Sequence, residues 1–172
     1  ANYWNEKAKL GEIYYKLLKE KAIKPMILIL PESGDNGKSW YTNWYKANNK
    51  KYEDFFIEDF LDELKTRYKI NSFAISGFFF VFYGALKLSL KNLSKFVSVS
   101  SLAGAINFPR LFLTELKGLG LLRLLKASPL LTRSENSKQF AKVFGEELQN
   151  MRKENVYYIL RKKCKNNIEE VK

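Results

Sequence analysis

Residues 72–93 read SFAISGFFFVFYGALKLSLKNL, and this stretch decides the fold. The uncharged run Ile70–Leu86 begins just before it, covers most of it and is interrupted by serine and glycine. Its length reaches only the lower limit for a membrane span. A buried strand at Ser72–Ser76 followed by a helix at Tyr83–Leu93 accounts for the pattern better, so we predict no transmembrane segment.

The segments before this stretch predict one helix and one strand. Apolar residues from Leu10 to Leu18 recur at helical spacing, which indicates a helix over residues 5–22. Met26–Leu30, between Pro25 and Pro31, is a continuous apolar run. A run without alternation is typical of a strand buried on both faces of a parallel sheet.

The segments after residue 50 continue the same order. A second amphipathic helix is predicted from Ile57 to Tyr68, and a third strand at Phe96–Ser101. Helices that alternate with strands predict an α/β fold with a mainly parallel sheet flanked by helices. After Pro109 the chain becomes leucine-rich, and we predict a helical excursion over residues 110–165 within a single domain spanning 1–172.

Composition excludes several classes of site. Lys and Arg number 30 against 18 acids, a net charge of +12, but the charges are scattered and no nucleic-acid motif is present, so we predict no nucleic-acid partner. The chain contains no histidine and only one cysteine, Cys164. A Ser-His-Asp triad, a Cys-His dyad, a histidine-ligated metal and an internal disulfide therefore cannot form within it, and we expect no metal or cofactor.

Six segments share their order and spacing with one known family. They are Lys24–Pro31, Ser39–Trp44, Tyr52–Phe55, Ala74–Gly77, Tyr83–Leu88 and Ser98–Ala105. Together they resemble the putative esterase branch of the α/β hydrolases, which includes esterase D (S-formylglutathione hydrolase), tributyrin and feruloyl esterases. The resemblance implies a partial α/β-hydrolase fold, a carboxylic ester hydrolase lineage and small-molecule esters as substrates of intact relatives.

The nucleophile turn is where the chain departs from that family. The turn typically reads SGLSMGGYGA, whereas Ser76–Ala85 reads SGFFFVFYGA without a gap. Phe79 therefore stands at the nucleophile position and Val81 and Phe82 at the two glycines, where strand and helix must pass closely. The resemblance places the backbone N–H of Phe80 at one oxyanion donor. A phenyl ring cannot attack a carbonyl, so we predict that this chain is catalytically inactive.

Other side chains offer weaker candidates for a site. Ser76 lies on the strand and has no histidine as a base, and the spacing does not favour a Ser-Lys dyad with Lys87 or Lys91. The resemblance places Trp40, Asn43 and Trp44 near the rim of the active-site pocket. The alternative interpretation is that the two tryptophans cover the core.

The ends of the chain lead to three further expectations. Relative to the family, the sequence begins inside the first helix region and ends before the next strand, so it is interpreted as an incomplete domain. A truncated parallel sheet leaves an edge strand unpaired, which predicts self-association. Ala1–Lys9 is polar and lacks a secretory signal, which favours a cytoplasmic location.

Two alternatives to an inactive esterase remain open. One is a non-catalytic binding module, with an apolar patch formed by Phe78, Phe79, Phe80 and Phe82. The other is a basic membrane-peripheral protein that uses the leucine-rich Leu111–Leu125 and the basic run Arg161–Lys165.

Overall fold

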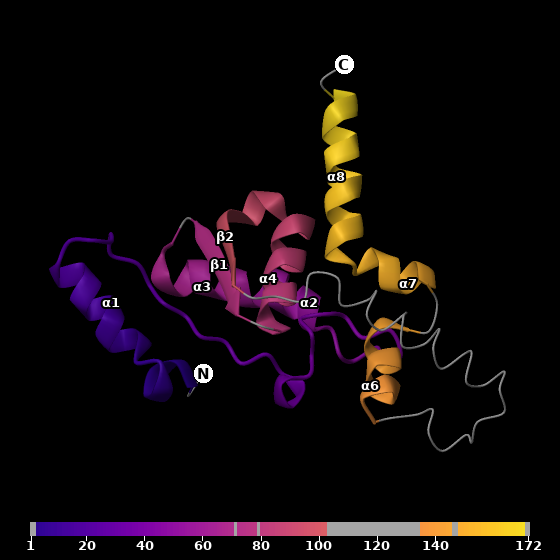
Figure 1. Ribbon diagram of the computed structural model, residues 1–172, viewed down its shortest axis with the longest axis horizontal. Coiled ribbons are helices and arrows are strands. Elements are labelled where there is room, and N and C mark those ends of the chain that lie inside the picture. The colour runs from indigo at the N-terminus through magenta and orange to yellow at the C-terminus, as the bar shows by residue number, and fades with distance from the viewer. Residues whose placement is uncertain (1–2, 71, 79, 103–134, 146–147, 171–172) are drawn as a thin grey trace.

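The computed structural model describes residues 3–70, 72–78, 80–102, 135–145 and 148–170. Its centre is a β–α–β unit in which strand β1 (Phe73–Phe78) and strand β2 (Phe96–Leu102) pair in parallel. Helix α4 (Phe80–Lys91) lies between them in sequence and packs beside the sheet (Figure 1). The predicted strand and helix of the 72–93 stretch and the predicted third strand are thus confirmed, with shifts of a few residues.

The two faces of the sheet differ in burial. On β1, Phe73 and Gly77 are buried, whereas the alternate residues Ala74, Ser76 and Phe78 are exposed. The register slips between Phe73 and Ala74 and is then regular up to the pairing of Phe78 with Leu102. One face therefore packs on the core while the other is open in the described part of the chain.

The predicted second amphipathic helix is a continuous helical rod from residue 52 to residue 68. It consists of α2 (Tyr52–Asp54), a π-helical turn (Phe55–Phe60) and α3 (Leu61–Tyr68). Its apolar stripe is buried at Ile57, Leu61 and Leu64, which pack in one cluster with Phe73 of β1 and Leu88 of α4. This packing explains why a mixed apolar and charged sequence forms a helix here.

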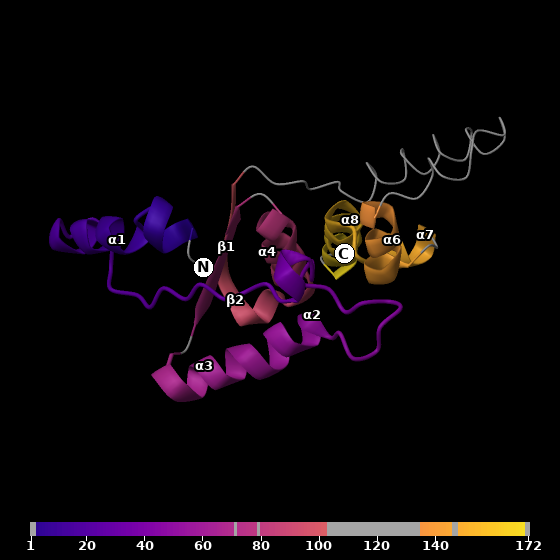
Figure 2. The same ribbon diagram turned by 90° about the horizontal axis from the view of Figure 1, so that it is seen from below.

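Helix α1 (Leu10–Lys19) confirms the first predicted helix, shorter than expected and preceded by a π-helical turn (Tyr3–Lys7). No α1 residue is buried, and Ile13 is 51% exposed. Figures 1 and 2 show α1 lying to one side of the sheet, away from α4. The Tyr14 hydroxyl ties the helix to the following segment by donating to Met26 O (2.5 Å) and accepting from Met26 N (2.9 Å).

The prediction of a buried strand at Met26–Leu30 is wrong. The segment is extended but pairs with no strand in the described part of the chain. Met26, Ile27 and Leu28 are 52%, 49% and 43% exposed, and Ile29 packs against the cluster around Phe73. An apolar run becomes a strand only if its backbone groups pair with those of a neighbouring strand, and here the Tyr14 hydroxyl bonds the N–H and C=O of Met26 instead.

The C-terminal part is helical, as predicted, with α6 (Glu135–Phe144), α7 (Leu148–Lys153) and α8 (Val156–Glu170). A second core cluster joins these helices to α4 and to the segment Ser39–Trp44, which we call the aromatic loop; the cluster contains Trp44, Tyr83, Val143, Phe144, Met151 and Val156. Most of the predicted excursion, including Leu111–Leu125, lies outside the described residues. Within those residues, no helix is long and apolar enough to cross a membrane.

Candidate active site

The bend that corresponds to the family's nucleophile turn joins β1 directly to α4. β1 ends at Phe78 and α4 begins at Phe80; Phe79 lies outside the described residues. Further along α4, a Cβ added to Gly84 would lie 2.5 Å from Cδ2 of Tyr41, so the glycine permits close contact between helix and loop. The structure thus has a strand–bend–helix arrangement here, with the Phe80 backbone N–H at the start of a helix.

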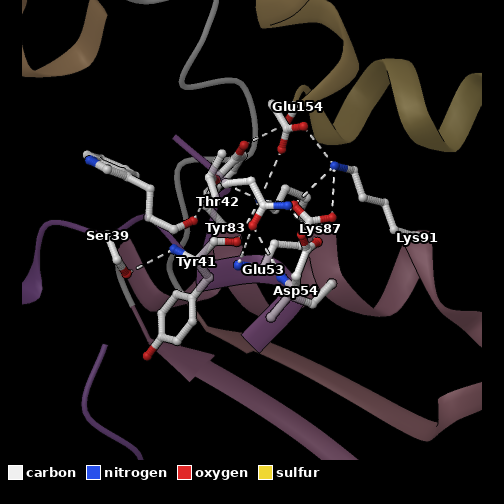
Figure 3. A network of polar contacts seen from close by, with 12 residues as sticks. Ser39, Tyr41, Thr42, Glu53, Asp54, Tyr83, Lys87, Lys91 and Glu154 are labelled. Atoms are coloured by element: carbon white, nitrogen blue, oxygen red, sulfur yellow. Dashed lines mark hydrogen bonds and ion pairs between the residues drawn. The ribbon is translucent and has the colours of Figure 1, made fainter. Parts of the chain in front are cut away.

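A buried polar cluster lies on the opposite side of α4 from its sheet contacts, near the junction of α7 and α8 (Figure 3). We call it the Lys87 cluster; its charged members are Lys87, Lys91, Glu53 and Glu154. Lys87 Nζ donates to Glu53 Oε2 at 2.9 Å and lies 3.0 Å from Glu154 Oε2, the latter an ion pair without hydrogen-bond geometry. Lys91 Nζ lies 3.0 Å from Glu53 Oε1 and 2.7 Å from Glu154 Oε1. Two cations and two anions thus neutralise one another.

Neutral groups complete the coordination of Lys87. Its Nζ donates to Tyr41 O at 2.7 Å and to Thr42 Oγ1 at 2.6 Å, which with Glu53 accounts for all three ammonium hydrogens. The Tyr83 hydroxyl donates to Glu154 O at 2.6 Å. The Lys87 side chain is 0% exposed, so every donor it carries has to be satisfied by the protein.

The electrostatics follow from this pairing. Burial by itself raises the pKa of Glu154, but Lys87 and Lys91 outweigh burial and hold the pKa below its ordinary value. Burial by itself lowers the pKa of Lys91, but Glu154 and Glu53 raise it above its ordinary value. Burial, reinforced by Glu154, places the pKa of Tyr83 well above its usual value. The charged forms of the lysine and the carboxylate are therefore the stable ones.

All three donors of Lys87 are used within the Lys87 cluster. The Lys87 ammonium donates all its hydrogens to fixed acceptors, and the nearest hydroxyl, on Thr42, is 1% exposed and itself donates to Trp40 O. No contact between Ser76 and either lysine occurs among the described residues, and Ser76 lies on the exposed face of β1. The cluster is a structural tie that joins α4, α2, the aromatic loop and the α7–α8 junction.

The predicted pocket-rim residues make contacts within the protein. Trp44 is 7% exposed and belongs to the second core cluster. The ring of Trp40 makes edge contacts with Tyr83 and Phe144, with centroids 6.1 and 6.0 Å apart. The two tryptophans therefore cover the core, as the alternative interpretation predicted. Their role at a pocket rim stays a prediction.

Asn43 holds the start of α2. Its Oδ1 accepts hydrogen bonds from the backbone N–H groups of Glu53 (3.1 Å) and Asp54 (3.2 Å), and its Nδ2 donates to Asp54 Oδ1 at 2.6 Å. Three hydrogen bonds thus hold the first turn of α2, from which Glu53 reaches Lys87. The contribution of Asn43 to a pocket rim stays a prediction, as it does for the two tryptophans.

The apolar patch at the bend and the basic run on α8 belong to the two alternative functions, and the described residues include part of each. Phe78 is 48% exposed, and its ring meets Trp4 edge-on with centroids 6.2 Å apart. Phe79 and the side chains of Phe80 and Phe82 lie outside what the structure describes. In the basic run, Arg161 and Lys162 are exposed on α8.

Comparison with known proteins identifies the class. A family model described as Putative esterase matches residues 1–167, which is nearly the whole chain. The chain therefore belongs to the putative esterase family, in agreement with the resemblance of its segments. No curated protein and no solved structure matches it.

Proposed function

We propose that this chain is a non-catalytic member of the esterase family. The observation that carries the proposal is Phe79 at the nucleophile position, in a sequence that has no histidine anywhere. Catalytic acyl transfer needs a nucleophile with a free lone pair, and in the serine esterases it also needs a base to take the hydroxyl proton as the new bond to the carbonyl carbon forms. A phenyl ring supplies neither a lone pair nor an ionisable proton.

The surroundings of the bend support the proposal. If another side chain near the bend acted as the nucleophile, it would need a free base to take its proton. The two lysines of α4, Lys87 and Lys91, are both paired with carboxylates in the Lys87 cluster. The family's oxyanion donor position at Phe80 retains a backbone N–H at a helix start. A donor for a developing negative charge cannot accelerate a reaction that has no attacking group.

Multiple-turnover hydrolysis of p-nitrophenyl acetate tests the proposal. A lysine-rich chain acylates its own amines slowly and stoichiometrically, so the control is the same chain unfolded in urea, and the signal is turnover beyond one equivalent. We expect the folded chain to release p-nitrophenolate no faster than that control and to remain unlabelled by a fluorophosphonate probe. Sustained turnover above the control, or labelling that requires the folded state, would overturn the proposal.

A second candidate function is apolar ligand binding at the bend. The observation that favours it is the half-exposed Phe78, next to the ring of Trp4. A fluorescent fatty acid titrated into the wild-type chain should then bind at least tenfold more tightly than it binds to Phe78→Ser. Equal affinity for the two chains excludes this candidate.

A further inference from the structure

The outer edge of β2 is unpaired among the described residues. The sheet of the described residues has two strands, so β2 pairs with β1 along one edge and with no strand of that part of the chain along the other. Its apolar side chains are exposed: Val97 at 74%, Val99 at 41% and Leu102 at 57%. A strand edge presents a row of N–H and C=O groups that can pair with another strand.

The usual devices that protect an edge are weak in this strand. Phe96–Leu102 reads FVSVSSL and contains no charge, proline or glycine. The irregular register lies at its start, near Val97, and leaves Ser98–Leu102 regularly paired with β1. β1 is also unpaired along its outer edge in the described residues, but its side chains are better covered, because Phe73 is buried and the Trp4 ring meets Phe78 edge-on. We therefore take the edge of β2 as the more accessible of the two.

The charge distribution indicates what can pair with this edge. The chain carries +12, so most approaches of a second copy are opposed by repulsion. Both strands lack ionisable residues, which makes this sheet a surface where two copies can meet without placing like charges opposite each other. An acidic partner would gain no attraction from the uncharged edge and would favour the basic surfaces instead.

We propose that two copies of the chain pair through β2 in antiparallel orientation, forming a four-stranded sheet across a two-fold axis. Such pairing is isologous and therefore closes at a dimer. The middle of the strand is Val99, and the middle of its regular part is Ser100, so the axis lies at one of these two residues. The proposal concerns assembly and is independent of whether the chain is catalytic.

A cysteine scan tests both the pairing and its direction. In a Cys164→Ser background, which removes the exposed native thiol, single cysteines replace Val97, Ser98, Val99 and Ser100 in turn. Residues opposite themselves in an antiparallel pair have Cβ atoms about 4.5–5.5 Å apart, a separation from which a disulfide can form with small backbone movement. We expect mild oxidation to give one maximum of crosslinked dimer, at position 99 or 100.

Position 97 is the matched control, because Val97 is more exposed than Val99 and Leu102. Random collision would crosslink it fastest, and parallel pairing in register would crosslink all four positions. Either outcome overturns the proposal. A strongest crosslink at 98 would overturn the placement of the axis.

Light scattering on the unmodified chain supplies the second measurement. We expect twice the chain mass of 20.1 kDa, with a dimer fraction that rises as salt screens the net charge. Val99→Lys should give a monomer with unchanged circular dichroism, whereas Ser94→Lys, which adds the same charge at an exposed position before the strand, should leave the dimer intact. A monodisperse monomer for the wild-type chain would refute the proposal.

Discussion

Lys87→Met tests whether the Lys87 cluster holds the fold together. Methionine keeps an unbranched apolar stem of similar length and removes only the ammonium group. The variant leaves Tyr41 O and Thr42 Oγ1 without their donor and leaves two carboxylates facing one cation, Lys91. The cluster, neutral in the wild type, then carries one negative charge.

The expected loss of stability in Lys87→Met depends on the ion pairs that remain in the cluster. Removal of one partner from a buried ion pair costs about 3–5 kcal/mol when the other charge is left uncompensated. Here Glu53 and Glu154 keep Lys91 at 3.0 and 2.7 Å, and their side chains are 14% and 18% exposed, so water and the second lysine offset part of the loss. We expect Lys87→Met to lower the free energy of unfolding by about 2–3 kcal/mol.

Urea denaturation followed by circular dichroism measures this change. The matched control is Lys16→Met, which breaks the exposed Lys16–Glu20 pair of α1 and should leave the urea midpoint unchanged. Adding Glu154→Gln to Lys87→Met restores neutrality, so the double variant should lose about 1–2 kcal/mol less than the sum of the single changes. A loss below about 0.5 kcal/mol for Lys87→Met, or strict additivity in the double variant, would refute the structural role of the cluster.

Four more perturbations probe the same framework. The pKa of Glu154 is lowered on folding, so its contribution is complete above its ordinary value of 4.5 and is lost as pH falls through the lowered folded value; Glu154→Gln should flatten the acid limb of a stability–pH curve. The pKa of Lys91 is raised, so its contribution is complete below 10.5 and is lost as pH rises through the folded value, and Lys91→Met should flatten the alkaline limb. Asn43→Ala removes the side-chain acceptor of the Glu53 and Asp54 N–H groups and should cost about 1–2 kcal/mol in urea denaturation; an unchanged urea midpoint would contradict this role. Gly84→Val places a branched side chain against Tyr41 and should lower the thermal midpoint by an amount that corresponds to about 1–3 kcal/mol; an unchanged midpoint would mean that α4 and the loop do not approach so closely.

The local spacing of apolar residues was sufficient to predict the central β–α–β unit and the helices. The strand–bend–helix of residues 73–91 and the rod from 52 to 68 follow from runs of apolar residues at the spacing of each element. In these segments the local preference and the tertiary packing agree, because each apolar stripe finds a face to cover.

Met26–Leu30 shows where local pattern was insufficient. Its composition is that of a central strand, yet strand formation depends on a neighbour whose backbone groups are free, and no single-segment pattern reports that neighbour. In the described structure, Tyr14 of α1 takes up both backbone groups of Met26, and the next two residues are exposed.

The Lys87 cluster was missed for a different reason. Lys87 and Lys91 are one turn apart on a helix, and Glu53 stands in the first turn of another, which is the ordinary pattern of solvated helix faces. Glu154 lies 63 residues beyond Lys91, so nothing local connects them. The one sequence signal is that Lys87 stands among the leucines 86, 88 and 90, which indicates a helix segment packed on the core.

The Lys87 cluster lies on turns of α4 beyond the bend, so the proposed loss of a nucleophile at residue 79 need not weaken the contacts that hold the fold. Elbow residues of an esterase serve chemistry, and their strained geometry costs stability. The contacts that join α4 to α2 and to the α7–α8 junction come instead from Lys87, Lys91 and Tyr83, on turns of the helix beyond the bend. Substitutions at residues 79–82 therefore leave the ion pairs untouched. If that is correct, restoring glycine at Val81 and Phe82 should shift the urea midpoint far less than Lys87→Met does, and a larger shift would show that the aromatic bend had become part of the core.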